Sequence, residues 1–184
     1  MSPQPRRAWP AGVAPEHVRN AAGLILVFPD AGDRAHIVLT VRAGTLERHG
    51  GQVSLPGGVI EPGESYAHAA LREAHEEIAL DARLVRVVGA LTAIDIPVSG
   101  FRLHPIVGLS EARPAFAPAH GEVARILDVA IDDLTTPGCV AQTAREREGR
   151  RIDAPAFCLA GEEIWGATAM VLAEFLLLLG WSRG

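Results

Sequence analysis

Apolar runs of strand length recur along the chain, separated by turn residues and by two stretches with helical spacing. The first two runs, Ala21–Phe28 and His36–Arg42, are joined by the turn sequence Pro-Asp-Ala-Gly-Asp, which predicts two neighbouring strands. Further strands are predicted at Gln52–Leu55, Leu84–Ile96, Arg102–Leu109 and Glu122–Ile131. The charged segment Arg145–Arg151 is predicted to be a hairpin tip between strands.

The two helical stretches complete the predicted layout. Ser65 is a suitable N-cap for a helix that runs to about Ile78 with an apolar stripe on one side. Gly166–Leu179 is predicted to form the closing helix, and Leu177 and Leu178 lie off its core-facing stripe. This extra apolar surface indicates either a homodimer contact or a deeply buried helix. Strands interleaved with helices predict an α/β fold in which helices cover both faces of a mixed sheet.

Length and charge limit the function classes. A chain of 184 residues with 48% hydrophobic content has room for one substantial core. We expect a Pro-rich leader over residues 1–20 and a single domain over 21–184. The net charge of −5 and the pI near 5.8 argue against a general nucleic-acid binder. A small anionic substrate remains compatible with this charge if metal ions hold it.

No feature of the sequence predicts export or a membrane partner. Cys139 and Cys158 form neither a CxxC pair nor a zinc pattern, so we expect free thiols in a reducing compartment and no disulfide. No apolar run follows the N-terminal arginines, so no signal peptide is evident. The apolar C-terminal segment is interrupted by Glu174 and is short for a membrane span. We expect a soluble, cytoplasmic protein.

Three carboxylates on one helical turn supply the candidate chemistry. Glu73, Glu76 and Glu77 have i, i+3 and i+4 spacing, which makes them neighbours on the helix surface. They lie beside the apolar stripe, so the acids are predicted to line a groove wall. Like charges held there are destabilising unless a cation joins them, and hard oxygen ligands suit Mg²⁺ or Mn²⁺. The alternative is the solvated face of a surface helix.

The wider segment Gly58–Leu80 resembles the Nudix box, a long motif with fixed glycine, glutamate and arginine positions. The matching residues are Gly58, Glu64, Arg72, Glu73, Ala74, Glu76, Glu77 and Leu80. Ala79 stands where the family usually has Gly. A left-handed residue fits that helix end, and Ala there costs about 1 kcal/mol. The resemblance implies a Nudix-type α/β/α sandwich with a mixed sheet and a catalytic loop-helix-loop at Gly58–Leu80.

A second motif upstream resembles the coenzyme A diphosphatase (CoA pyrophosphatase) branch of the Nudix family. It comprises Leu39, Thr40, Arg42, Ala43, Gly51, Pro56, Gly57 and Gly58. Two positions depart from the branch pattern, because Glu47 replaces an Arg and Leu55 replaces a Phe. Arg48 and His49 keep basic character beside Glu47. The run Ile164–Ala169 also resembles the entry to the C-terminal helix of that branch.

The resemblance assigns roles within the box. It implies that Glu73 and Glu77 are metal ligands, together with the backbone carbonyl of Gly57. Glu76 either completes the metal shell or takes the proton from the attacking water. Arg72 is expected to orient the carboxylates. Glu64 is expected to fix the loop and pair with Arg72, with a role around the metal as the alternative.

Residues outside the box complete the predicted site. Glu122 follows a Pro- and Ala-rich loop, where Nudix proteins often place a metal ligand or base, and an exposed loop residue is the alternative. The residues implied in substrate binding, by charge or by their place in the branch motif, are Arg42, Arg48, His49, Gly51 and Gly58. Taken singly, each basic residue is also typical of a solvated surface.

Three functions follow from these observations. The first is Mg²⁺- or Mn²⁺-dependent hydrolysis of the diphosphate of coenzyme A or its derivatives, giving adenosine 3′,5′-bisphosphate and 4′-phosphopantetheine compounds. The second is the same reaction on another nucleoside diphosphate derivative such as ADP-ribose, NADH or a nucleotide sugar, because Glu47 would repel a 3′-phosphate. The third is a non-catalytic Nudix-fold binding module, for which the loss of a ligand glutamate is expected, and none is lost here.

Overall fold

The computed structural model describes residues 18–44, 51–147, 150–159 and 161–181. Within them, most strands belong to one eight-stranded sheet. Its members are β1 (Arg19–Pro29), β2 (Ala35–Arg42), β3 (Val53–Ser54), β4 (Gly57–Val59), β5 (Arg86–Ala90), β6 (Ile94–Ile96), β7 (Phe101–Leu109) and β8 (Val123–Ala130). The order is β3-β2-β1-β7-β5, with β4 on β1, β6 on β7 and β8 on β2. Strands β1 and β7 are parallel and the other pairs are antiparallel, which confirms the mixed sheet.

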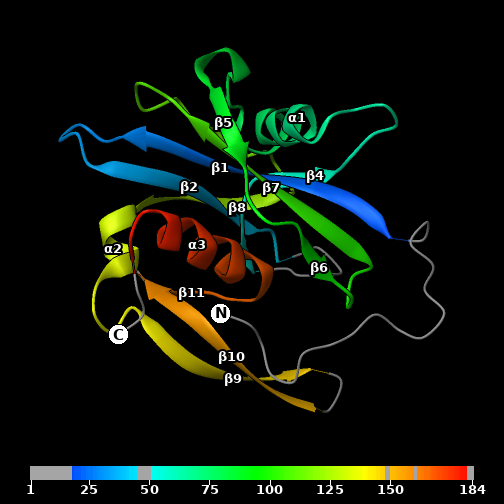
Figure 1. Ribbon diagram of the computed structural model, residues 1–184, viewed down its shortest axis with the longest axis vertical. Helices are drawn as coiled ribbons and strands as arrows, with labels where there is room; N and C mark the ends of the chain where they lie inside the picture. Colours follow the sequence, from blue (N-terminus) through cyan, green and yellow to red (C-terminus); the bar gives the residue numbers. More distant parts are fainter. Residues whose placement is uncertain (1–17, 45–50, 148–149, 160, 182–184) are drawn as a thin grey trace.

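Helices cover both faces of this sheet (Figure 1). Helix α1 (Tyr66–Ile78) lies on one face and α3 (Gly166–Leu178) on the other. The predicted α/β/α arrangement is therefore confirmed. A second, three-stranded sheet lies beyond α3, formed by β9 (Val140–Arg147), β10 (Arg150–Leu159) and β11 (Glu162–Ile164). The sequence predicted a hairpin at this point but not a separate layer.

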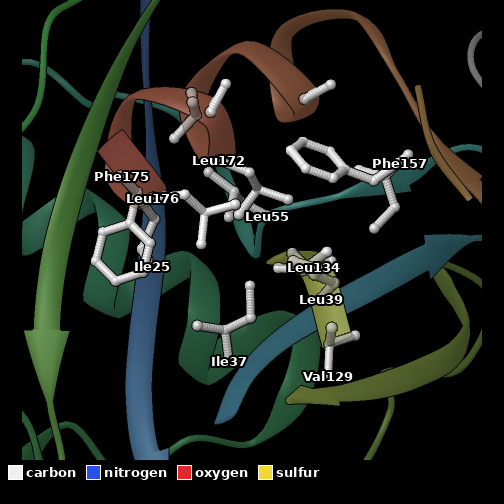
Figure 2. Packing of buried hydrophobic residues seen from close by; sticks show 14 of the residues in the cluster. Ile25, Ile37, Leu39, Leu55, Val129, Leu134, Phe157, Leu172, Phe175 and Leu176 are labelled. Atoms are coloured by element: carbon white, nitrogen blue, oxygen red, sulfur yellow. The ribbon is translucent and has the colours of Figure 1, made fainter. Parts of the chain in front are cut away.

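The alternation of side chains along β1 builds the two halves of the core. Leu24 and Leu26 pack with Ala70 of α1, whereas Ile25 between them packs on the opposite face with residues of α3. Figure 2 shows Leu172 of α3 above the strands that carry this second cluster. Because successive residues of a strand point to opposite faces, one strand supports both helix layers. The strand therefore fixes α1 relative to the rest of the core.

Two predicted elements were wrong in their extent. The expected strand Leu84–Ile96 is divided into the 3-10 turn η2 (Ala82–Leu84), β5 and β6. Between β5 and β6, the amide and hydroxyl of Thr92 both donate to Glu174 of α3, at 2.9 and 2.8 Å. This long-range contact takes the backbone out of the ladder, and a local pattern does not contain it. At the end of β8, Ile131 begins the short helix α2 (Ile131–Thr135) rather than extending the strand.

Burial accounts for only some of the apolar residues of helix α3. Residues such as Leu172 and Leu176 are fully buried between the two sheets, so a helix that is apolar on several sides fits its surroundings. Leu177 and Leu178 are nevertheless 57% and 71% exposed, so burial does not account for them. The homodimer stays a prediction. Among the helices described, none has the length and apolar character required to cross a bilayer.

Candidate active site

Local sequence signals place the acidic turn of α1. At the start of the helix, the Ser65 side chain accepts a hydrogen bond from the amide of His68 at 3.2 Å, as predicted for an N-cap. At its end, Ala79 adopts a left-handed conformation with φ of 55°, where Gly would be more favourable. The amides of Ala79 and Leu80 bond to His75 and Ala74 carbonyls. The helix therefore closes after Ile78, the residue that follows Glu77.

Glu77 is the most deeply buried carboxylate of the turn. Its side chain is 8% exposed, and its Oε2 accepts a hydrogen bond from the Gly57 amide at 3.1 Å. The Arg42 Nη1 lies 3.8 Å from Oε1, a separation too long for a hydrogen bond. Burial raises the pKa of Glu77 to about 7, although Gly57 and Arg42 act in the opposite direction. An anionic Glu77 therefore lacks adequate compensation within the described residues.

Glu73 lies against the backbone of the Pro-Gly-Gly loop. A Cβ atom built on Gly58 would be 2.4 Å from the Glu73 carboxyl carbon, and one on Gly57 would be 2.3 Å from the Ala22 carbonyl oxygen. Position 57 therefore requires glycine, because the obstacle is backbone, whereas a side chain at position 58 would displace the Glu73 carboxylate. Burial raises the pKa of Glu73, while the Arg72 guanidinium lowers it and nearby carboxylates add to the increase. Two carboxylates with raised pKa values thus face the same loop.

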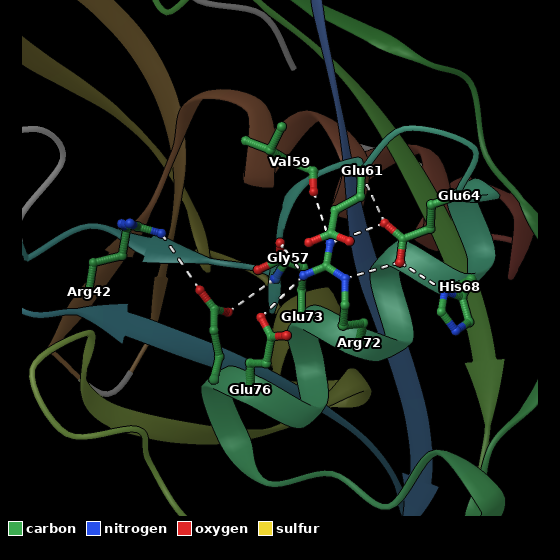
Figure 3. Close-up of polar contacts among 10 residues, drawn as sticks. Arg42, Gly57, Val59, Glu61, Glu64, His68, Arg72, Glu73 and Glu76 are labelled. Atoms are coloured by element: carbon green, nitrogen blue, oxygen red, sulfur yellow. Dashed lines mark hydrogen bonds and ion pairs between the residues drawn. The ribbon is translucent and has the colours of Figure 1, made fainter.

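Arg72 lies among the carboxylates on the other side of this turn (Figure 3). Arginine has five N–H donors, and each has an acceptor here. Nε and Nη2 form a fork to Glu64 at 3.0 and 3.1 Å, and Nη1 donates to Glu73 and Glu76 at 3.0 and 3.1 Å. Nη2 also donates to the Val59 carbonyl at 3.0 Å. With its donors occupied, Arg72 is suited to orienting carboxylates rather than to binding a phosphate.

Glu64 completes this well-compensated part of the site. Its side chain is 6% exposed and accepts hydrogen bonds from Arg72, from the Glu61 amide at 3.1 Å and from His68, whose Nδ1 lies at 2.8 Å. The hydrogen bonds from Arg72 are the main reason that the pKa of Glu64 is lowered to about 2. Glu64 therefore stabilises the loop and orients Arg72.

The loop before β8 brings Glu122 toward the buried acids. In this loop, the amides of Ala117 and Ala119 donate to the carbonyls of Ile78 and Glu77, at 3.0 and 2.8 Å. These hydrogen bonds satisfy carbonyls that the end of the helix leaves unpaired. The Glu122 carbonyl accepts from the Ala43 amide at 2.9 Å. The charge of exposed Glu122 adds to the raised pKa of both Glu73 and Glu77.

The remaining predicted site residues are distributed as follows. Gly51 has a φ of 75°, and its amide donates to the Arg42 carbonyl at 2.9 Å, so it lies beside the Arg42 backbone. Arg48 and His49 lie outside the described residues, as does Glu47. Box residues Glu64, Arg72, Glu73, Glu76 and Glu77 lie together with Gly57, Gly58 and Arg42.

A protein-family model described as the NUDIX domain matches residues 17–126, more than half of the chain. The chain belongs to the Nudix family. A Pectobacterium atrosepticum protein named "Uncharacterized Nudix hydrolase NudL" is 32% identical over 169 residues, covering 91% of this chain and 87% of the relative. A Citrobacter koseri protein of the same name is 34% identical over 166 residues, covering 88% and 83%.

Solved structures agree with the family assignment. The Nudix hydrolase RenU from M. smegmatis has a TM-score of 0.55 and 26% identity, covering 66% of this chain and 78% of RenU. A MutT/nudix family protein from Enterococcus faecalis has a TM-score of 0.57 at 13% identity, covering 95% and 66%, and it supports the fold alone. The predicted Nudix fold and pyrophosphohydrolase class are confirmed, while the coenzyme A branch is only hinted at.

Nudix hydrolases generally use divalent metal ions such as Mg²⁺ or Mn²⁺. In the part of the chain that the structure describes, no three acidic, histidine or cysteine side chains enclose a common metal position. Mg²⁺ typically takes one or two protein carboxylates and completes its shell with water and substrate phosphates. Glu73 and Glu77, whose pKa values are both raised, fit that requirement. A bound cation would offset the cost of burying their negative charges and would reduce their mutual repulsion.

Several contacts around the site were not predicted. The Val59 carbonyl is an acceptor for Arg72, and sequence gives no signal for a backbone acceptor of this kind. The hydrogen bond from the Ala119 amide to the Glu77 carbonyl joins positions far apart in the chain, and the sequence gives no signal for it either. His68, by contrast, lies four residues after Glu64, and that helical spacing contained a usable signal.

Proposed function

We propose that this Nudix hydrolase cleaves the diphosphate bond of coenzyme A or its derivatives in a Mg²⁺- or Mn²⁺-dependent reaction. The products are adenosine 3′,5′-bisphosphate and a 4′-phosphopantetheine compound. The observation that carries the catalytic part is the pair formed by partly buried Glu73 and buried Glu77, whose pKa values are both raised beside Gly57 and Gly58. The substrate part rests on the branch motif around Leu39, Thr40, Arg42 and Ala43.

In the proposed mechanism, Glu73 and Glu77 would hold the metal with the carbonyl of Gly57, and Glu76 would be a further ligand in a shell that water and substrate phosphates complete. A bound divalent ion supplies charge neutralisation at the diphosphate and a more acidic water. The protein contributes placement. Gly58 leaves space for the carboxylate of Glu73, and Arg72 holds Glu73 and Glu76 in fixed orientations.

We assign the general base to Glu122, with Glu76 as the alternative. Glu76 uses one carboxylate oxygen to accept from Arg72 at 3.1 Å. Among the described residues, no donor to the Glu122 side chain is found. The charge of Glu122 contributes to the raised pKa values of Glu73 and Glu77. A carboxylate with free acceptor capacity is the better proton acceptor.

The two candidates can be separated by pH–rate profiles of Glu122→Gln and Glu76→Gln. Loss of the base lowers kcat by roughly a hundredfold or more and removes the acidic limb of the profile. Loss of a metal ligand instead raises the metal concentration needed for half-maximal rate. If Glu122→Gln shows the second behaviour and Glu76→Gln the first, the assignment is reversed.

Arg42 is proposed to bind substrate phosphate. Its backbone is fixed by the Gln52 carbonyl and the Gly51 amide, at 3.0 and 2.9 Å. Its guanidinium lies 3.8 Å from Glu77, without a hydrogen bond to that acid. Within the part of the chain that the structure describes, Arg42, unlike Arg72, therefore keeps N–H donors for a phosphate next to the metal ligands.

A second substrate class is retained because of Glu47. If this residue faces the 3′-phosphate that distinguishes coenzyme A, its charge would disfavour that substrate and favour another nucleoside diphosphate derivative, such as ADP-ribose, NADH or a nucleotide sugar. Glu47→Arg should then improve the use of coenzyme A relative to its dephospho form. An unchanged ranking of the two would remove this reason for the second class.

A substrate panel tests the whole proposal. Purified protein with Mg²⁺ is incubated with coenzyme A, dephospho-coenzyme A, ADP-ribose, NADH and a nucleotide sugar, and products are identified by mass spectrometry. We expect the largest kcat/KM for coenzyme A or an acyl or oxidised derivative. A larger value for another diphosphate selects the second class. No turnover of any diphosphate with Mg²⁺ or Mn²⁺ would favour the non-catalytic binding module.

A further inference from the structure

Thr168, in the first turn of α3, makes a buried contact with the strand that leads to the Pro-Gly-Gly loop. Its hydroxyl donates to the carbonyl of Val53 in β3 at 3.1 Å. The two residues are 115 positions apart in the chain, and both are buried, at 9% and 5% exposed. The contact therefore links the C-terminal helix to a segment that continues into Gly57.

The Val53 carbonyl needs such a donor because of its place in the sheet. Among the described strands, β3 pairs with β2 alone, and opposed residues of an antiparallel pair alternate between hydrogen-bonded and non-hydrogen-bonded pairs. The Arg42 amide donates to the Gln52 carbonyl at 3.0 Å, which marks a hydrogen-bonded pair. Val41 and Val53 are the next pair along, so the Val53 carbonyl points away from β2. A buried carbonyl without a donor is destabilising, and the Thr168 hydroxyl supplies that donor.

The same segment reaches the acidic turn within a few residues. The Leu55 side chain packs in the core cluster that α3 helps to form (Figure 2). The Pro56 carbonyl accepts a hydrogen bond from the Leu24 amide at 2.8 Å, and the Gly57 amide donates to Glu77 Oε2 at 3.1 Å. Residues 53–57 are therefore held by α3 at one end and by β1 and α1 at the other, with little chain between them to absorb a shift.

We propose that Thr168 is a positioning residue for the metal site, because by holding Val53 it fixes the backbone of Gly57 against Glu77. This role rests on the proposed function, in which the Gly57 carbonyl and Glu77 are metal ligands. Without the hydroxyl, the outer edge of β3 loses a donor, and the segment up to Gly57 gains freedom to move. Metal ligands depend on outer contacts of this kind for their orientation. The C-terminal helix thus contributes to metal binding without touching the metal.

Thr168→Val in the full chain tests this role, because Val keeps the shape of Thr and lacks the hydroxyl. Hydrogen exchange of the Gly57 amide is followed by nuclear magnetic resonance in metal-free protein, and Mn²⁺ binding is measured by electron paramagnetic resonance of the free ion. We expect the Gly57 amide to exchange at least about threefold faster and Mn²⁺ to bind about threefold to tenfold more weakly. Thr168→Ser retains the donor and should keep the wild-type values of both.

Thr143→Val is the matched control, because the Thr143 hydroxyl donates to the Ala154 carbonyl at 2.9 Å within the second sheet. It should lower the midpoint of thermal unfolding and leave Gly57 exchange and Mn²⁺ binding unchanged. The proposal is overturned if Thr168→Val leaves either value at that of a wild type that binds Mn²⁺, or if Thr143→Val or Thr168→Ser changes them as much. No Mn²⁺ binding by wild type would instead overturn the proposed metal site, while faster Gly57 exchange in Thr168→Val would still show that the hydroxyl holds this backbone.

Discussion

The two ends of the acidic turn differ in how their charge is compensated. Around Arg72, five donors meet acceptors, and the pKa of Glu64 is lowered to about 2. Around Glu77, one amide and an arginine 3.8 Å away accompany a carboxylate that is 8% exposed, and its pKa is raised to about 7. At the first end, protein groups alone compensate the charges. The second has an excess of negative charge, which is where we place the metal.

The largest effect is expected from Glu77→Gln, which removes charge from the incomplete end while keeping its shape. Turnover should fall roughly a hundredfold to a thousandfold, because a charged ligand is lost. In metal-free buffer at pH 8 the variant should unfold at a higher temperature than wild type, since a buried anion is removed. Steady-state kinetics measures the loss of turnover, and thermal unfolding measures the rise in unfolding temperature.

Glu111→Gln is the matched control, an exposed acid outside the described contacts of the turn. It should change neither turnover nor stability. Equal turnover by Glu77→Gln and wild type would show that the second end is no different from a solvated helix face.

The two ends should also respond to pH in opposite directions. Because the folded protein raises the pKa of Glu77 from 4.5 to about 7, its contribution favours the fold below pH 4.5 and is lost as the pH rises to 7. The loss is about 3 kcal/mol in metal-free protein. Glu64 has a lowered pKa, so its contribution is present above pH 4.5 and is lost as the pH falls toward 2. Denaturant unfolding across this range measures both.

Glu77→Gln should reduce the decrease between pH 4.5 and 7 to the part that Glu73 contributes, because the pKa of Glu73 is also raised, and should leave the decrease at lower pH intact. Saturating Mg²⁺ should have the same effect on wild type. A decrease as large in the variant as in wild type would assign it to a group other than Glu77.

Much of this comparison could be predicted from sequence, and the reasons are local. The N-cap at Ser65, the helix to Ile78 and the left-handed Ala79 follow from chain signals within a few residues of each position. The pairing of Glu64 with Arg72 was also predicted, and the structure contains it. Spacing along a single helix is sufficient for such predictions.

Features that depend on distant segments were missed. The division of the strand predicted at Leu84–Ile96 depends on Glu174 of α3. The difference between Arg72 and Arg42 depends on counting acceptors from three separate segments, which no motif contains. Hydrogen bonding, rather than exposure, separates Glu64 from Glu77 in pKa, because the Arg72 fork compensates the burial of Glu64 whereas the single Gly57 amide does not compensate that of Glu77.

A smaller effect is expected from Arg42→Met, which tests whether this arginine is the weak counterion of the incomplete end. Without the competing cation, Mn²⁺ should bind about threefold more tightly in the absence of substrate. The KM for the diphosphate substrate should rise about tenfold, because a charge-assisted hydrogen bond to phosphate is lost. Calorimetry and steady-state kinetics should therefore show changes in opposite directions.

Arg113→Met provides the comparison, since Arg113 is 51% exposed and pairs with Asp128 outside the acidic turn. It should leave both quantities unchanged. If Arg42→Met weakens metal and substrate binding together, Arg42 acts by positioning Glu77 and not by competing with the cation.

The smallest effect concerns the helix that carries both ends. Ala79→Gly should raise the free energy of unfolding by up to about 1 kcal/mol, because Ala79 has a φ of 55° and Gly adopts that conformation without strain. Ala67→Gly, within the same helix, should lower it by a similar amount. Denaturant unfolding measures the stability of both variants. If Ala79→Gly is no more stable than wild type, the left-handed conformation of Ala79 does not destabilise the helix. Turnover should stay unchanged in Ala79→Gly.

Titration of Mn²⁺ into metal-free protein at pH 8, without substrate, tests the central claim most directly. Electron paramagnetic resonance of free Mn²⁺ counts the ions bound by wild type, Glu77→Gln and Glu64→Gln. We predict binding by wild type, weakening of at least about tenfold in Glu77→Gln, and a smaller change in Glu64→Gln. Equal binding by wild type and Glu77→Gln, or no binding by wild type, would contradict a cation held at the incompletely compensated end of the turn.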